Sequence, residues 1–279
     1  MMRNGVFVKP SQVAWRTRIR WLLAAVGATA LMIVAATFLP RTSLLPVNVR
    51  QPNPPPFLLA RSRDGRWLQD ITYLANELPR LHIDPFHNVS KSEFRLRVAA
   101  LQANIAMFTD DEIRLRLMAL VAMIGEGHTT LNFTPFYQGD NGWRLYPLSV
   151  AWLEEGWYVV GAQAENQQLL GAQLVAINDM PINDVFDRVA PLVAADNDVQ
   201  RRTTGATLLL TAEVLAGLDI VENMDSARFA FILLEGTNVE VPLAATPPAT
   251  LQLQGIQPQV PMRETPLVLR NPDRWYWYE

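Results

Sequence analysis

The spacing of apolar residues changes along the chain and divides it into three regions. Residues 21–39 form an unbroken uncharged run, and residues 66–124 carry apolar positions at helical spacing. From residue 146 onward, apolar positions fall in short runs separated by turn residues. Helical spacing builds one apolar face, whereas short runs between turns are typical of strands. The pattern therefore predicts an α+β chain: one N-terminal transmembrane helix, a small helical subdomain and a β-rich subdomain.

The run Trp21–Leu39 is long enough to cross a membrane. As a helix rising ~1.5 Å per residue it would span about 28 Å, close to the ~30 Å thickness of the hydrocarbon layer. Residues 1–20 carry five basic residues and no acidic one, which predicts a cytoplasmic tail and an extracytoplasmic bulk. The alternative is a signal peptide, cleaved near Val34-Ala35-Ala36, and a secreted protein.

Residues 40–65 are rich in proline and predict an extended linker between the membrane and the folded part. Three helices are then expected within residues 66–130. A serine or threonine followed three residues later by glutamate opens the second and the third, which is a capping-box signature. Pro79 is expected to end the first helix and Gly125 the third. The expected spans are Arg66–Leu78, Ser90–Met107 and Thr109–Ile124.

Strands dominate the region 140–245. Turn residues at 154–156 and 235–237 separate paired apolar runs and predict two hairpins. Residues 246–279 are predicted to be a linker, followed by the truncated start of a missing domain. The expected elements are strands Leu148–Leu153, Trp157–Gly161, Leu174–Ile177, Arg228–Leu234 and Asn238–Leu243, with helices starting at Pro181 and spanning Ala206–Ala216.

Composition narrows the function classes. The 279 residues are 49% hydrophobic and 18% charged, as in globular proteins, and the net charge of −3 offers no basic surface for nucleic acid. The absence of cysteine excludes disulfides, thiolate metal sites and a cysteine nucleophile. We therefore expect no nucleic-acid partner.

Two clusters of titratable residues have structural explanations. His82, Asp84 and His87 are potential metal ligands, but Asp-Pro and Asn beside them are ordinary turn chemistry. Residues 110–112 (Asp-Asp-Glu) resemble an acid–base cluster, yet acidic residues are favoured at a helix N-terminus by the helix dipole. We accordingly expect neither a metal ion nor a cofactor.

The segment Leu169–Val185 is the most informative stretch of the chain. A strand, a tight turn at Asn178-Asp179 and a helix follow one another, and the segment is similar to the G-x-x-L-x-x-I-N-[GD]-x-P pattern of PDZ-type modules. Such modules hold an extended peptide against a sheet edge. The resemblance implies a PDZ-like subdomain, which either binds peptides or serves as a spacer. The candidate peptide-binding residues are Leu169, Leu170, Gly171, Ala172 and Gln173.

Three blocks stand in a characteristic order: W-L-x-D-I-x-Y-L from Trp67, L-V-A-M-I-G-E-G-H-T from Leu120, and the block from Leu169. An aromatic segment, Trp275–Tyr278, follows them. The order resembles the N-terminal half of a tail-specific (C-terminal-processing) serine protease. The resemblance implies a loop of interest at Glu126, His128 and Thr129, where the alternative is a helix end closed by glycines.

The catalytic Ser and Lys of that family would lie beyond the last residue of this chain. Only Lys9 and Lys91 are present, one in the cytoplasmic tail and one at an exposed helix start, and neither fits a desolvated base. We therefore expect no catalytic residue here. The predicted function is the membrane-anchored substrate-recognition part of such a protease, with a polypeptide partner. The alternatives are a stand-alone peptide- or protein-binding scaffold and a non-functional gene fragment.

Overall fold

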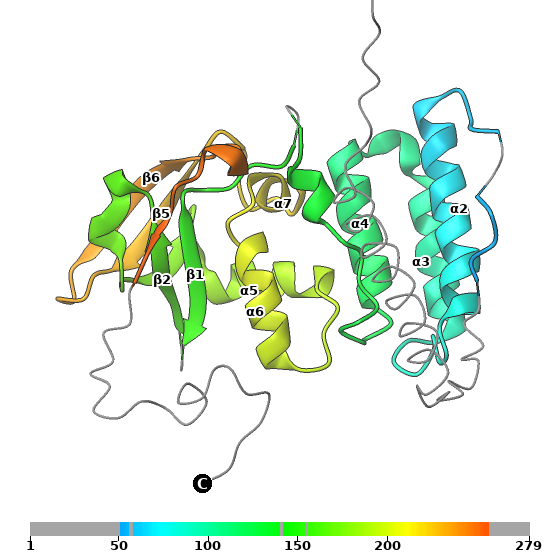
Figure 1. Cartoon of the computed structure of the whole chain (residues 1–279), viewed down its shortest axis with the longest axis horizontal. Helices are drawn as coiled ribbons and strands as arrows, with labels where there is room; N and C mark the ends of the chain where they lie inside the picture. Colours follow the sequence, from blue (N-terminus) through cyan, green and yellow to red (C-terminus); the bar gives the residue numbers. More distant parts are fainter. Residues whose placement is uncertain (1–50, 56–57, 140–141, 154–155, 257–279) are drawn as a thin grey trace, which may run out of the picture. The chain divides into compact units, whose positions relative to one another are not determined.

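The computed structural model describes residues 51–55, 58–139, 142–153 and 156–256. Along these residues helices come first and an antiparallel sheet with further helices follows (Figure 1). The predicted α+β class is therefore confirmed. No helix in these ranges combines the length and apolar character that a membrane crossing requires. The expected membrane segment Trp21–Leu39 and the basic tail lie outside the described residues.

Three helices build the first part: α2 (Arg63–Leu81), α3 (Lys91–Ala103) and α4 (Asp110–Ala122). Each begins at a hydroxyl cap, in which the side chain of Ser62, Ser90 or Thr109 accepts a hydrogen bond from a backbone N–H three residues later. This satisfies a donor that the helix leaves unpaired. Apolar side chains from all three helices close one core, among them Ile71, Phe94 and Ile113, and Ile124 joins it just beyond the end of α4.

Three helix ends differ clearly from the prediction, both ends of α2 and the last turn of α3. Helix α2 starts three residues earlier, because Ser62 caps it, and it continues through Pro79 to Leu81. The backbone N–H of His82 still bonds the carbonyl of Leu78, so the last turn closes despite the proline. Helix α3 stops at Ala103, and a 3-10 turn at Ile105–Met107 replaces its expected last turn.

The predicted linker 40–65 is partly anchored to α2. The buried carboxylate of Glu77 accepts hydrogen bonds from the backbone N–H of Asn53 at 2.7 Å and from its amide at 2.6 Å. The hydroxyl of Tyr73 donates to the carbonyl of Asn53. Arg80 and then Asn53 hold the pKa of Glu77 down at about 2, because both favour its charged form.

This anchor predicts an acid-sensitive contribution to stability. A carboxyl whose pKa falls from 4.5 to about 2 on folding favours the folded state above pH 4.5 and loses that effect as the pH falls towards 2. We expect Glu77→Gln to lower the melting temperature of the full chain at pH 7 and to differ less from wild type near pH 2. Thermal unfolding followed by circular dichroism from pH 7 to 2 measures this. Glu165→Gln, at an exposed glutamate, is the control, and a constant difference across the pH range would contradict the assignment.

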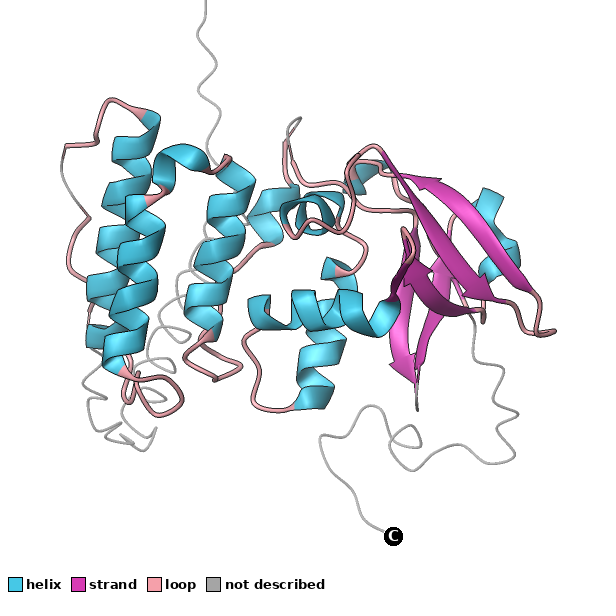
Figure 2. Ribbon diagram, turned by 180° about the vertical axis from the view of Figure 1, so that it is seen from behind, coloured by secondary structure: helices cyan, strands magenta, loops and turns pink. Residues whose placement is uncertain are grey.

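Among the described residues, seven strands form one sheet in the order β1-β2-β3-β5-β6, with β4 beside β3 and β7 beside β2 (Figure 2). Both predicted hairpins are confirmed, since β1 pairs with β2 and β5 with β6 in antiparallel register. The turn at Asn178-Asp179 is confirmed as well, with φ of 43° and 64°. The strands are β1 (Leu148–Leu153), β2 (Gly156–Ala162), β3 (Gln173–Ile177), β4 (Met180–Pro181), β5 (Ser226–Ile232), β6 (Asn238–Ala244) and β7 (Gln254–Gly255).

The expected single helix Ala206–Ala216 is two helices in the structure. Helix α5 (Ile182–Val189) follows β4, and then come α6 (Asp198–Leu208) and α7 (Ala212–Gly217). The chain breaks between the last two because residues 210–212 form backbone hydrogen bonds with residues 144–146 instead of continuing the helix. The sequence from 246 is also more than a linker, since β7 pairs with β2, whereas residues 257–279 lie outside the described part.

Candidate functional site

A groove of about 910 Å³ runs between α3–α4 on one side and α5–α6 on the other. This volume lies in the range of ligand-binding clefts. Its floor is apolar and its rim carries arginines and acids. The floor residues are Leu101, Phe108, Ala119, Leu120, Met123, Phe186, Pro191 and Val193, and the charged residues are Glu93, Arg97, Arg116, Asp187, Asp198, Arg201 and Arg202.

The four arginines of the groove fall into two kinds. Arg201 forms an ion pair of 2.9 Å with Asp198, and Arg97 a looser one of 3.9 Å with Glu93. Arg116 instead lies over the ring of Phe108, with 3.6 Å from its guanidinium carbon to the ring centroid, and Arg202 lies over Trp152 at 4.1 Å. Among the described residues, neither Arg116 nor Arg202 has a carboxylate within ion-pair distance.

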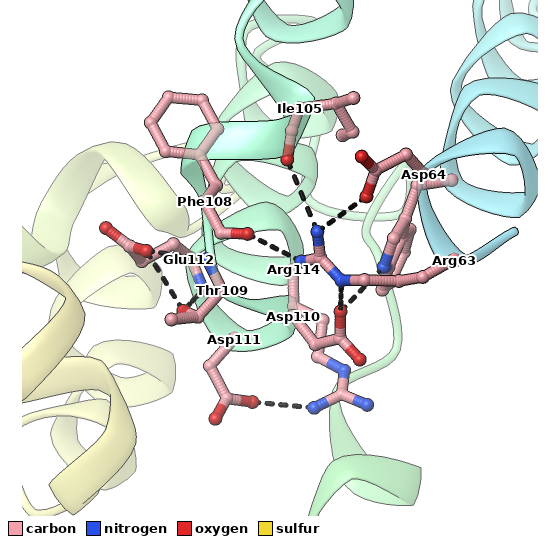
Figure 3. A network of polar contacts seen from close by, with 10 residues as sticks. Arg63, Asp64, Ile105, Phe108, Thr109, Asp110, Asp111, Glu112 and Arg114 are labelled. Atoms are coloured by element: carbon pink, nitrogen blue, oxygen red, sulfur yellow. Dashed lines mark hydrogen bonds and ion pairs between the residues drawn. The ribbon is translucent and has the colours of Figure 1, made fainter.

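The start of α4 is fixed by a polar network (Figure 3). The guanidinium of Arg63 donates to the carboxylate of Asp110 at 2.7 Å and to the carbonyl of Phe108 at 2.5 Å. The indole of Trp67 also donates to Asp110, and Trp67 and Arg63 together hold the pKa of Asp110 below its usual value. Thr109 and Glu112 form the predicted capping box. The acidic cluster at 110–112 thus serves the helix start, as its position at a helix N-terminus predicted.

The end of α4 leads into the loop 125–129, the G-E-G-H-T motif. Glu126 accepts from the Nε2 of His82 at 2.6 Å and from the hydroxyl of Thr129 at 3.1 Å. These two bonds, with a further contribution from the charge of His128, hold the pKa of Glu126 below its usual value. The loop is thereby attached to the C-terminal end of α2.

The same loop is also attached to the start of α6. The backbone N–H of Gly127 donates to the carboxylate of Asp196 at 2.7 Å, and the backbone N–H of Asp196 donates to the side chain of Gln200 at 2.8 Å. A Cβ atom at Gly127 would lie 2.3 Å from the Gln200 amide, so glycine permits the close approach. Because α4 and α6 form opposite walls of the groove, the loop 125–129 fixes the distance between them.

Replacement of glycine by alanine should cost more stability at Gly125, in this loop, than at Gly139, outside it. Gly125 has a φ of +79° and its Cβ would contact the side chain of Asn88, whose amide donates to the carbonyl of Met123. Gly139 has a φ of +81° with open space around it. We expect Gly139→Ala to cost about 1 kcal/mol of unfolding free energy from the backbone alone. Gly125→Ala should cost up to about 2 kcal/mol, because it also displaces Asn88. Urea unfolding of both variants measures the difference, and equal costs would show that Asn88 contributes nothing.

The histidine cluster has no metal-binding geometry. Both nitrogens of His82 are engaged, Nε2 with Glu126 and Nδ1 with the backbone N–H of Asp84, and His87 contacts the carbonyl of Asp84. Within the described ranges, no three or more His, Cys, Asp or Glu side chains gather closely enough to hold a metal ion. His128 is exposed, and a role for it in substrate contact stays a prediction.

The candidate peptide-binding segment 169–173 runs from the end of a 3-10 turn (Ala164–Leu169) into the first residue of β3. Leu169 and Ala172 are fully buried. The backbone N–H groups of Leu170, Gly171 and Ala172 donate to the carbonyls of Gln167, Val159 and Leu169. Gln173 belongs to β3, which has β2 on one side and β5 on the other. Peptide binding at this segment stays a prediction, and the donors that a peptide would need there already have partners.

Lys91 lies between Ser90 and Ser92, but both hydroxyls belong to the start of α3, where Ser90 accepts from the backbone N–H of Glu93 and contacts the hydroxyl of Ser92. Ser149 lies in β1 and Ser226 in β5, and Lys91 is exposed at the start of α3. No serine or threonine hydroxyl among the described residues bonds to a histidine or lysine.

Comparison with known proteins adds little to this site. No model of a known protein family matches the chain, and no curated protein matches it. Two solved structures of mature CPAF are similar. The complex with lactacystin aligns with a TM-score of 0.49 and 13% identity over 65% of this chain and 35% of that one. A crystal structure of mature CPAF aligns with a TM-score of 0.48 and 13% identity over 65% of this chain and 34% of that one. The chain spans about a third of the length of these structures.

Proposed function

We propose that this chain is the membrane-anchored, extracytoplasmic recognition part of a protein similar to tail-specific serine proteases, and that it binds polypeptides without cleaving them. The observation that carries the proposal is the groove between α3–α4 and α5–α6. It combines an apolar floor with charged rim residues, as polypeptide-binding surfaces do. The G-E-G-H-T motif supports it, because this loop fixes the two walls of the groove.

The second candidate is a stand-alone membrane-anchored scaffold, in which the same groove binds a partner protein and no protease domain takes part. Both candidates bind polypeptides through this chain, and they differ in whether a protease domain acts on what is bound. The PDZ-like role of segment 169–173 belongs to the same proposal, but since its backbone donors are paired, a bound peptide would contact the half-buried side chains of Leu170 and Gln173 instead of adding a strand.

Binding and catalytic silence are tested together with the full chain in detergent micelles. Fluorescein-labelled β-casein, an extended polypeptide, should bind saturably in an anisotropy titration and stay intact on a gel after prolonged incubation. A fluorophosphonate probe should leave the chain unlabelled. The absence of binding would refute the recognition role. Cleavage that a single substitution in this chain abolishes would refute catalytic silence.

The membrane topology has its own test. Five basic residues and no acidic residue precede Trp21, so the groove is expected outside the cytoplasm. Alkaline phosphatase fused at Gly142 should be active, and β-galactosidase fused there should be inactive, when expressed in a bacterium. The reverse pair of activities would place the folded part in the cytoplasm and refute the proposed location.

A further inference from the structure

We infer that the groove selects a polypeptide segment in which carboxylate side chains alternate with aromatic or aliphatic ones. The inference rests on the proposed function and names the chemistry of its partner. It follows from the two aromatic-stacked arginines, the pairing of the remaining charges and the rigid spacing of the walls.

The floor of the groove provides the apolar half of the specificity. Leu101, Leu120 and Val193 are already buried at the base of the groove, whereas Phe108, Ala119 and Met123 keep part of their surface exposed in it. Aliphatic and aromatic side chains of a bound segment would remove this exposed part from water, at a gain of roughly 25 cal/mol per Å² of apolar area. A uniformly charged ligand would gain nothing from such a floor.

Arg116 and Arg202 would select the acidic side chains of the bound segment. Each guanidinium places one face on an aromatic ring, which orients it and leaves the donors at its edge available. Arg116 uses one nitrogen to bond the carbonyl of Glu112 at 3.1 Å. Its remaining donors have the fork geometry that matches a carboxylate. A stacked arginine is already ordered, so less entropy is lost when it binds.

The other charges of the groove largely cancel. Glu93 faces Arg97 and Asp198 faces Arg201, which leaves Asp187 as the acid of the lining without an ion pair among the described residues. The two stacked arginines and the single unpaired aspartate favour a ligand whose carboxylate groups are separated from one another. A polyanion such as nucleic acid would meet Asp187 and a chain whose net charge is −3. The charge pattern therefore favours an acidic and apolar polypeptide over a nucleic acid.

The test uses three labelled dodecapeptides with blocked ends. The first alternates Asp with Leu and Phe, the second carries Asn in place of Asp, and the third carries Lys. Anisotropy titrations with the full chain in micelles at 0.15 M NaCl should show the Asp peptide binding at least about 10-fold more tightly than the others. Arg116→Gln and Arg202→Gln should each weaken the Asp peptide about 5- to 10-fold and leave the Asn peptide unchanged. Arg95→Gln, on the opposite face of α3, is the matched control and should have no effect.

The outcomes separate this inference from the proposed function. Equal binding of all three peptides would overturn the inference and leave polypeptide recognition standing, whereas no binding of casein or of any peptide would overturn both. Tight binding of a deoxythymidine oligomer that competes with the Asp peptide would also overturn the inference. A rise in affinity on deletion of residues 257–279 would assign the groove to the chain's own segment instead of a separate partner. Should Arg116→Gln unfold the chain, Arg116→Lys keeps the charge without the stacked fork and should weaken binding to an intermediate degree.

Discussion

Replacement of Trp157 by alanine is expected to lower the free energy of unfolding by about 3–5 kcal/mol, the largest effect we foresee for a single change. The indole is fully buried in β2. It packs edge-on against Trp152 at 5.3 Å and beside Phe186 at 5.1 Å between ring centroids. Trp152 carries the stacked Arg202, and Phe186 lines the groove. The variant should therefore also lose affinity for bound peptides.

The matched control for this change is Trp157→Phe. The indole N–H of Trp157 is buried without a hydrogen-bond partner among the described residues. An unpaired buried donor costs about 1–3 kcal/mol of stability. Phenylalanine has a smaller ring, which lowers stability, but it lacks the unpaired N–H, which raises stability. We expect a net change below about 1.5 kcal/mol. Urea unfolding followed by tryptophan fluorescence and circular dichroism measures both variants, and equal large losses would show that the N–H has a partner in solution.

The second large effect is expected at Arg144. Its guanidinium donates to the buried carboxylate of Glu213 at 3.0 Å and to the exposed carboxylate of Asp225 at 2.6 Å. Arg144→Ala leaves the Glu213 charge buried with only the backbone N–H of residue 144 as its nearest donor. Removal of one partner of a buried pair is strongly destabilising, and we expect a loss of about 3 kcal/mol.

Asp225→Asn removes the charge of the second, exposed carboxylate partner of Arg144. Asp225 keeps 78% of its side chain exposed, and exposed ion pairs contribute little. We expect this variant to lose less than about 0.5 kcal/mol. Chemical unfolding of Arg144→Ala and Asp225→Asn under one set of conditions gives the comparison. If both variants lost the same free energy of unfolding, the exposed pair of Arg144 with Asp225, and not the buried pair with Glu213, would account for the stabilisation.

Local chemistry made parts of the fold predictable. Thr109 with Glu112 marked a helix start through the capping box that the structure contains. Asn178 and Asp179 marked the turn between β3 and β4, because these residue types tolerate positive φ. The hairpins were visible because their strands are neighbours in sequence. In each case the residues that determine the structure lie within a few positions of one another.

The groove was not predictable in the same way. Arg116 and Phe108 lie on either side of a helix start, and Arg202 and Trp152 are fifty residues apart, so no local pattern joins them. The break after α6 depends on pairing with residues 144–146. The G-E-G-H-T motif singled out the loop 125–129, but the contact of this loop with Asp196 depends on a distant segment.

The junction between Gly127 and Asp196 joins residues 69 positions apart. A ribosome that adds roughly 5–20 residues per second needs several seconds between the two. During that interval α4 is complete, but Leu115 and Met118 have not met the residues that bury them in the core shared with the sheet. A nascent chain therefore exposes an apolar helix face while its remaining partners are synthesised. A chaperone that protects this face would have to act until the residues around Asp196 are synthesised, because the groove can form only then.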